Sequence, residues 1–164
     1  MKVKAVIGEI CSGKTTYSLF FEEQYKEEGK SLKTIDIGSV VRELTSTHER
    51  VFDESLDVAI TNRLFQVITK ALHDGYDEVM IVGIRQVSIL NEVEKICEKR
   101  DIEVNIVFLD VPTHIREERY EARTAKKDTA LVFDFADKKD KELGLFSLIQ
   151  YIKHKKNTLI VKNY

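Results

Sequence analysis

The chain of 164 residues is long enough for one compact domain with a buried core and too short for two ordinary ones. Hydrophobic residues make up 43% and charged residues 33% of the sequence, as in typical globular proteins, and the net charge of −2 excludes a general attraction to nucleic acid or anionic membranes. The sequence contains no signal-peptide core and no apolar run near the roughly 18 residues that a membrane span needs, so we expect a single cytoplasmic domain over residues 1–164, without membrane contact.

The first predicted element is a strand that runs into a glycine-rich loop. An apolar, β-branched stretch at residues 3–7 is followed by GEICSGKT and then by apolar residues at helical spacing. Gly8 and Gly13, followed by Lys14 and Thr15, fit the pattern of a phosphate-binding loop between a strand and a helix. The glycines permit backbone angles that turn successive amides toward a polyphosphate, and the helix adds its positive end.

The side chains of this loop have expected roles in binding a nucleoside triphosphate. Lys14 is placed to reach the β and γ phosphates, and Thr15 is placed to offer its hydroxyl to Mg²⁺. The loop therefore predicts ATP, or another nucleoside triphosphate, and Mg²⁺ as ligands; a plain structural loop is the alternative. The expected donor-binding residues are Gly8, Ser12, Gly13, Lys14, Thr15 and Thr16.

Strands and helices alternate along the rest of the chain. We expect strands at residues 32–37, 79–82, 104–109 and 158–161, and helices at residues 39–44, 55–72, 90–97, 115–123 and 135–151. Ser39 is the expected N-cap of its helix, Gly75 is expected to end the next one, and the polar segments 45–53 and 124–129 are expected to be loops. This alternation predicts an α/β protein with the three-layer P-loop NTPase fold, in which helices cover both faces of a five-stranded parallel sheet.

Charged residues lie where ligands bind in such folds, at the carboxyl ends of the strands. Asp36 lies near the end of the second predicted strand, where it can act as a general base or only cap the backbone. Arg85 directly follows the buried third strand, where an unpaired guanidinium would be costly, which favours a ligand role. On the helix after the fourth strand, Arg116, Arg119 and Arg123 share one face, and they either bind phosphate or pair with neighbouring glutamates.

Several segments follow one another in the order found in one kinase family. GEICSGKTT, IDIGSVVRE, IVGIRQ, LDVPTHIREERYEAR and DKKDKELG together resemble the P-loop nucleoside monophosphate kinases, most closely their dephospho-coenzyme A kinase-like and adenylate kinase-related branch. The resemblance runs from the first strand to the last, and the phosphate loop is its one specific motif. It implies an acceptor-binding region at about residues 38–75 and a short, arginine-bearing lid at about residues 120–135.

The resemblance also implies roles for individual residues. Arg42 and Arg85 match the arginines that hold the acceptor phosphate, and Arg116, Arg119 and Arg123 fall where the family keeps its lid arginines. The expected catalytic residues are Lys14, Asp36, Arg85, Arg119 and Arg123, with Arg119 also binding the donor and Asp36, Arg42 and Arg85 binding the acceptor.

Two aspartates of the family pattern are missing from this chain. Val82 and Ser39 occupy their positions, one before the glycine that follows the third strand and one three residues before the acceptor arginine. Asp36 is the expected substitute, and Asp110 is a weaker one. An alcohol acceptor needs a base and a phosphate acceptor does not, so the acceptor class stays open between the two.

The sequence therefore predicts an ATP-dependent phosphotransferase that transfers phosphate, with Mg²⁺, to a nucleotide or a nucleotide-like small molecule. One alternative acceptor is a hydroxyl on modified DNA, such as a hydroxymethylated base, or on a polynucleotide, which the basic run at residues 153–156 permits. A second alternative is a non-catalytic nucleotide-binding sensor, although the chain has neither the Asn-Lys-x-Asp nor the Asp-x-x-Gly motif of GTPase switches. We expect a monomer or a homodimer.

Overall fold

Parallel strands form one sheet in the computed structural model, which describes residues 1–46, 54–124 and 129–164. The strands are β1 (Lys2–Gly8), β2 (Leu32–Asp36), β3 (Glu78–Val82), β4 (Glu103–Asp110) and β5 (Thr158–Lys162). They lie in the order β2-β3-β1-β4-β5, and every neighbouring pair is parallel. The predicted five-stranded parallel sheet is confirmed.

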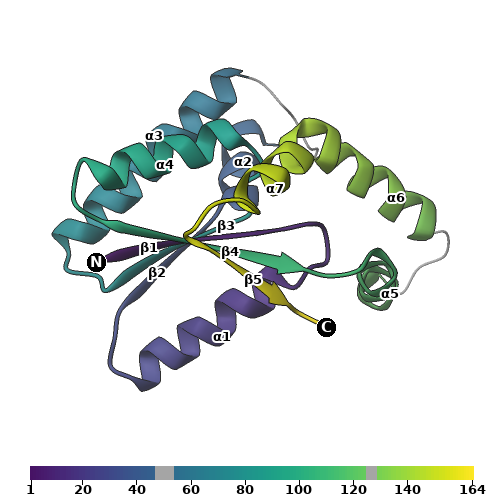
Figure 1. The fold of residues 1–164 in the computed structure, drawn as a ribbon, viewed down its shortest axis with the longest axis horizontal. Coiled ribbons are helices and arrows are strands. Elements are labelled where there is room, and N and C mark those ends of the chain that lie inside the picture. The colour runs from purple at the N-terminus through teal and green to yellow at the C-terminus, as the bar shows by residue number, and fades with distance from the viewer. Residues whose placement is uncertain (47–53, 125–128) are drawn as a thin grey trace.

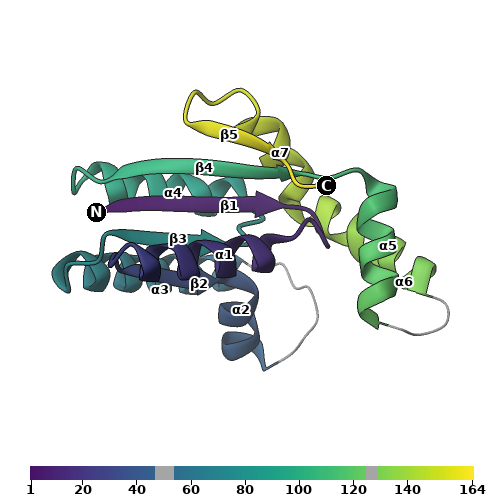
Figure 2. The same cartoon turned by 90° about the horizontal axis from the view of Figure 1, so that it is seen from below.

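Helices connect successive strands and cover both faces of the sheet, as predicted. The helical segments are α1 (Lys14–Glu27), α2 (Ile37–Thr45), α3 (Glu54–His73), α4 (Val87–Glu98), α5 (Thr113–Thr124), α6 (Thr129–Asp140), the π-helical turn η1 (Lys141–Leu145) and α7 (Phe146–Ile152). Figure 1 shows α1 on one side of the sheet and α2, α3, α4 and α7 on the other. Figure 2 shows α5 and α6 beyond the carboxyl ends of the strands.

Burial on both faces explains why the strands are so apolar. All five residues of β3 are buried. Along β1, Ala5 and Ile7 pack into a large cluster with residues of α3, α4 and α7. Val6 points to the opposite face, where it packs with Met80 and Leu109 under α1. This alternation with a covered layer on each side is the environment of a parallel sheet, and it fixes the ends of the strands in one row.

The helix predicted for residues 135–151 is interrupted, and this prediction was wrong. α6 passes into η1 and then into α7, and Gly144 within η1 has a φ of +123°. A Cβ atom at this position would lie 2.7 Å from Oε1 of Gln86 and 3.0 Å from the backbone oxygen of Arg85. Only glycine allows this approach and this backbone angle, so the turn packs tightly on the connection between β3 and α4.

The prediction that Ser39 caps the helix after β2 was also wrong. α2 begins two residues earlier, at Ile37, and its N-cap is Asp36, whose carboxylate accepts a hydrogen bond of 2.9 Å from the Gly38 amide. The predicted end of α3 is confirmed, because Gly75 follows that helix with a φ of +77°.

Two predicted loops fall mainly outside the described residues. These are residues 47–53 of the segment 45–53 and residues 125–128 of the segment 124–129, which is also the middle of the expected lid. On either side of 125–128, the expected lid region belongs to helices α5 and α6. Within the described parts of the chain, we find no helix that is both long and apolar enough to cross a bilayer.

Candidate functional site

A pocket of about 260 Å³ lies at the carboxyl ends of β1, β2 and β3. In parallel α/β sheets this edge is the usual place for ligands, at the point where the strand order changes direction. The predicted site residues that line it are Gly8, Gly13, Lys14, Thr15, Asp36, Arg42, Arg85 and Arg123, and they are joined by Ile10, Cys11, Gly38, Val82, Gly83 and Asp140. The fold thus brings residues from distant parts of the sequence into one cavity.

The phosphate loop leaves β1 at Gly8 and enters α1 at Lys14. Gly13 has a φ of +90°, and a Cβ atom there would lie 2.5 Å from Nδ2 of Asn163, whose amide donates a hydrogen bond of 2.9 Å to the Ser12 carbonyl. The Ser12 hydroxyl is buried and has no hydrogen-bond partner among the described residues. An unpaired buried donor in a glycine-shaped cradle fits a loop built to take an external acceptor such as a phosphate oxygen.

Lys14 lies folded over its own loop. Its ammonium donates hydrogen bonds of 2.8 Å to the carbonyls of Gly8 and Glu9. Burial, and to a smaller extent the charge of Arg85, lower the pKa of Lys14 to about 8, against the opposing effect of Asp140. An ammonium in this desolvated position favours an anionic ligand, because a bound phosphate would supply the stabilisation that water gives to an exposed ammonium.

Asp36 and Arg42 form one side of the pocket. Oδ2 of Asp36 accepts a hydrogen bond of 3.1 Å from the Ser39 hydroxyl and lies 3.8 Å from a guanidinium nitrogen of Arg42. Arg42 in turn donates a hydrogen bond of 2.8 Å to the Ser39 hydroxyl. Both charged side chains are about half exposed, so a ligand can reach them without unfolding this corner.

Arg85 pairs with an aspartate that sequence reasoning missed. Nε of Arg85 lies 3.4 Å from Oδ1 of Asp140, whose side chain is only 4% exposed although it lines the pocket. The segment DKKDKELG contains Asp140, but no local signal distinguishes it from the other acids of that segment. Its position follows from the end of α6 and the turn η1, which the sequence predicted as continuous helix.

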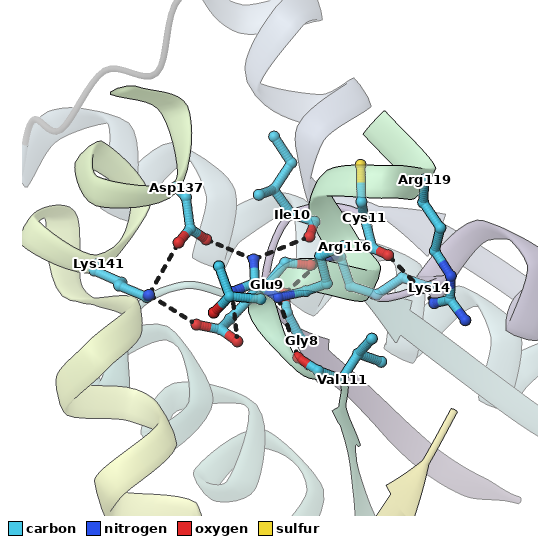
Figure 3. Close-up of polar contacts among 11 residues, drawn as sticks. Gly8, Glu9, Ile10, Cys11, Lys14, Val111, Arg116, Arg119, Asp137 and Lys141 are labelled. Atoms are coloured by element: carbon cyan, nitrogen blue, oxygen red, sulfur yellow. Dashed lines mark hydrogen bonds and ion pairs between the residues drawn. The ribbon is translucent and has the colours of Figure 1, made fainter. Parts of the chain in front are cut away.

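Arg116 differs from Arg119 and Arg123, the other two arginines on its face of α5, in being enclosed within the fold. It is fully buried, donates a hydrogen bond of 2.6 Å to Asp137, and lies 3.3 Å from a carboxylate oxygen of Glu9. Lys141 also pairs with both acids, at 2.9 Å to Asp137 and 3.2 Å to Glu9 (Figure 3). Arg116 therefore ties α5 and α6 to the phosphate loop, and the expectation that it acts as a lid arginine is corrected.

Arg119 and Arg123 take two different positions on α5. Arg119 donates to the backbone oxygens of Asn163 at 2.6 Å and Cys11 at 3.4 Å, so it lies against the outside of the phosphate loop. Arg123 is exposed and lines the pocket. Thr16, another predicted donor-binding residue, is exposed in the first turn of α1 and does not line the pocket.

The carboxylates and hydroxyls near the pocket determine whether it could bind a metal ion. Thr15 lines the cavity, and so do the carboxylates of Asp36 and Asp140, whereas Asp110 does not. Within residues 1–46, 54–124 and 129–164, no group of three or more His, Cys, Asp or Glu could hold a metal ion. Mg²⁺ takes few protein ligands and is completed by water and substrate phosphates, so the Thr15 hydroxyl remains a fitting ligand.

Comparison with known proteins identifies the fold. No family model matches the chain, and no curated protein matches it. Among solved structures, it is similar to the Mycobacterium tuberculosis APS kinase CysC in complex with AMPPNP and APS, with a TM-score of 0.57 and 21% identity over 77% of this chain and 73% of that one. It is also similar to APE1195, with a TM-score of 0.58 and 18% identity over 77% of this chain and 76% of the other. A cysteine-to-alanine variant of the CysC kinase gives a TM-score of 0.52 and 22% identity, covering 66% and 75%.

These similarities show that the chain has the fold of P-loop kinases, which agrees with the predicted three-layer architecture. Membership of the dephospho-coenzyme A kinase-like and adenylate kinase-related branch stays a prediction.

Proposed function

We propose that the protein is an ATP-dependent phosphotransferase that acts on a nucleotide or a nucleotide-like small acceptor. The observation that carries this proposal is the pocket, where the phosphate loop with Lys14 meets Arg42 and Arg85 from the connections after β2 and β3. One anion cradle beside two further guanidinium groups suits a site that holds two anionic molecules at once. The similarity to an APS kinase crystallised with AMPPNP, an ATP analogue, supports the same class.

The residues of the loop would bind the donor and stabilise the charge that develops during transfer. The backbone amides between Gly8 and Lys14 surround the phosphates, and Lys14 leaves the carbonyls of its own loop to neutralise charge between the β and γ phosphates. Arg123 adds a positive charge at the pocket. Mg²⁺, when bound through the Thr15 hydroxyl and substrate oxygens, would neutralise further phosphate charge.

Arg119 would act through the loop and the donor rather than the acceptor. Its guanidinium donates to the backbone oxygens of Cys11 and Asn163, and Arg119 does not line the pocket, whereas Arg42 and Arg85 do. We therefore keep Arg119 as a donor-side residue, with Asp36, Arg42 and Arg85 on the acceptor side.

The structure offers little support for the polynucleotide alternative. The basic run at residues 153–156 directly precedes β5, so it lies at the amino-terminal edge of the sheet, opposite the pocket. Lys155 is paired with Glu94 at 3.0 Å, and Lys153 lies over the ring of Phe108 at 5.6 Å. Two of these cations thus have partners within the fold, which makes the small acceptor our preferred proposal.

A transfer assay tests the proposed function. The purified protein is incubated with Mg²⁺ and ATP labelled at the γ phosphate, together with nucleoside monophosphates, dephospho-coenzyme A or hydroxymethylated DNA. Label transfer to a small molecule that depends on Lys14 supports the proposal. Tight donor binding without transfer to any acceptor would favour the sensor instead, and label on the DNA alone would favour the polynucleotide kinase.

Replacing the acceptor-side arginines should damage acceptor use more than donor binding. In Arg42→Ala and Arg85→Ala, the loss of each charge-assisted contact is expected to raise the activation free energy for use of the acceptor by about 1.5–3 kcal/mol. This lowers kcat/KM for the acceptor roughly 10- to 150-fold. Arg85→Ala should also lower stability, because it leaves buried Asp140 without this ion pair. Steady-state kinetics beside the Kd of AMPPNP separate the two effects, and an equal loss of donor affinity would reassign the arginines.

Donor affinity should fall as the pH rises above about 8. The pKa of Lys14, lowered to about 8 by burial and then by Arg85, means that the free protein loses this proton above that pH, whereas a bound triphosphate favours the charged form. Above this pH, donor binding requires the uptake of a proton, so the affinity for the donor should fall by up to about tenfold for each pH unit. By the same linkage, the unfolded chain binds the extra proton between pH 8 and 10.5, so the stability of the nucleotide-free protein rises with pH across this window.

Titration calorimetry with AMPPNP in buffers of different ionisation enthalpy measures this proton uptake. Lys14→Gln has no titrating group at this position and should lose the uptake along with most of the affinity. The same uptake in Lys14→Gln would assign it to another group.

A further inference from the structure

Asp140 is a buried negative charge in the wall of the pocket. The residue is only 3% exposed, yet it lines the cavity together with Lys14 and Arg85. Asp140 therefore shares the wall of the pocket with the lysine of the phosphate loop and with an arginine from the end of β3. A carboxylate this well shielded from water is costly unless it has partners, and Arg85 supplies one at 3.4 Å.

The end of α6 is fixed from two sides, and this fixes Asp140. On one side, the amide of Gln86 donates to the backbone oxygen of Leu143, and Gly144 allows the close contact between η1 and the segment after β3. On the other side, Lys141 pairs with Glu9 of the phosphate loop at 3.2 Å. A kink at Gly144, where the backbone is not helical, separates α6 from α7. Here its effect is to hold Asp140 between the donor loop and the acceptor-side arginine.

Asp36, the base expected from the sequence, is occupied as a structural cap. One of its carboxylate oxygens accepts from the Gly38 amide, and the other accepts from Ser39 and faces Arg42. Both oxygens of Asp36 are therefore already engaged at the start of α2. Asp36 is also half exposed, so it is placed to position α2 and Arg42 rather than to work in a water-excluded centre.

We propose that Asp140 is the general base of the transfer and that the acceptor reacts through a hydroxyl group. This inference rests on the proposed function. In the step, the acceptor O–H bond breaks and its proton passes to the Asp140 carboxylate, while the acceptor oxygen forms a bond to the γ phosphorus of the nucleoside triphosphate. The bond between that phosphorus and the β–γ bridging oxygen breaks, and its electron pair leaves with the nucleoside diphosphate.

A hydroxyl suits this position better than a phosphate does. A reacting phosphate is already ionised, so a carboxylate at this place would have no proton to accept from it. A hydroxyl is neutral, and its proton must be removed as it attacks. Arg85, already paired with Asp140, then orients the base, and Arg42 remains available for a non-reacting anionic part of a nucleotide-like acceptor.

Product analysis of the unmodified protein gives the first test. Nucleoside monophosphates offer both a phosphate and sugar hydroxyls, whereas dephospho-coenzyme A has no terminal phosphate and offers the hydroxyls of its ribose and of its pantoate unit, so both are incubated with ATP and Mg²⁺. ³¹P NMR separates a new phosphoester, made on a hydroxyl, from a new phosphoanhydride, made on a phosphate. We expect a phosphoester. A phosphoanhydride as the main product would overturn the inference and leave the proposed kinase intact, whereas transfer to neither acceptor would overturn both.

Substitutions then test the base on whichever hydroxyl acceptor is used. Asp140→Asn keeps the shape and a hydrogen-bond acceptor for Arg85, and it should lower kcat by roughly a hundredfold or more with little change in the Kd of AMPPNP. Asp36→Asn keeps the helix cap and should lower kcat less than about tenfold. Glu142→Gln, on the exposed surface of the same turn, is the matched control and should keep full activity.

The outcome that would refute the assignment is a fully active Asp140→Asn protein, and a large loss confined to Asp36→Asn would return the base to Asp36. If Asp140→Asn lowers the melting temperature too far for assay, Asp140→Glu serves in its place. The carboxylate of that variant is displaced by one methylene, so kcat should fall while the pH profile of the residual rate keeps its acidic limb, the loss of rate at low pH as the carboxylate is protonated. Loss of that limb would contradict a carboxylate base at this position.

Discussion

Lys14→Ala is expected to lower the rate of phosphoryl transfer by roughly a hundred- to a thousandfold or more, while the fold stays intact. The ammonium is the one charged group of the loop itself that points into the pocket from a desolvated position, and it stabilises charge that appears only as the γ phosphate moves. Single-turnover assays with labelled ATP measure the loss. Unchanged turnover would refute the proposed function as a whole.

We also expect an unusual effect of Lys14→Ala on the stability of the protein. A pKa lowered to about 8, chiefly by burial, means that the folded protein disfavours the charged form of Lys14 at neutral pH. Removing the ammonium should therefore not lower the melting temperature of the nucleotide-free protein, even though two hydrogen bonds are lost. Lys99→Ala, which changes an exposed lysine next to α4, is the control for both activity and stability. A large drop in melting temperature would indicate that Lys14 holds the loop together.

Arg116→Ala should be among the most destabilising substitutions in the chain, at about 3–5 kcal/mol. The change removes a fully buried guanidinium and, among the described residues, leaves Lys141 as the one cation that Asp137 and Glu9 share. It also removes the contact of the guanidinium with the ring of Phe133. Urea unfolding followed by circular dichroism measures the loss.

Arg123→Ala is the matched control, because this arginine lies on the same helix but is exposed. It should change stability by less than about 0.5 kcal/mol and act on transfer instead. Similar stabilities for the two variants would contradict the structural role of Arg116, and a loss of donor binding without loss of stability in Arg116→Ala would return it to the lid arginines.

The contrast between these arginines shows what the sequence could and could not predict. Spacing alone placed Arg116, Arg119 and Arg123 on one helical face, which is correct for α5 as an isolated helix. Which of them is buried depends on α6, whose Asp137 approaches Arg116 from 21 residues further along the chain. No local sequence pattern predicts that contact, so the three arginines could not be assigned different environments from the sequence.

The phosphate loop and the sheet were predictable because their signals are local. Two glycines, a lysine and a threonine at fixed spacing require the strand–loop–helix context that the structure shows, and the apolar strands follow from burial on both faces. Asp36 as a helix cap was also within reach, since aspartate is a favoured N-cap, but Ser39 competes by the same rule. The position of Asp140 could not be predicted, because it depends on the contact between Gly144 and Gln86, which are 58 residues apart in the sequence.

The ion pairs that join Glu9 to Arg116 of α5 and Lys141 of η1 bear on how this protein can move. Rotating the carboxyl end of α6 outward would pull Lys141 and Asp137 away from Glu9 and Arg116. Several buried charges would then lose their ion-pair partners at once, which is energetically costly. Mechanically, that end of the helix therefore belongs to the same rigid block as the phosphate loop. We therefore expect the Asp140 carboxylate to be in place before a donor binds, so that the proposed site is preorganised rather than assembled by binding.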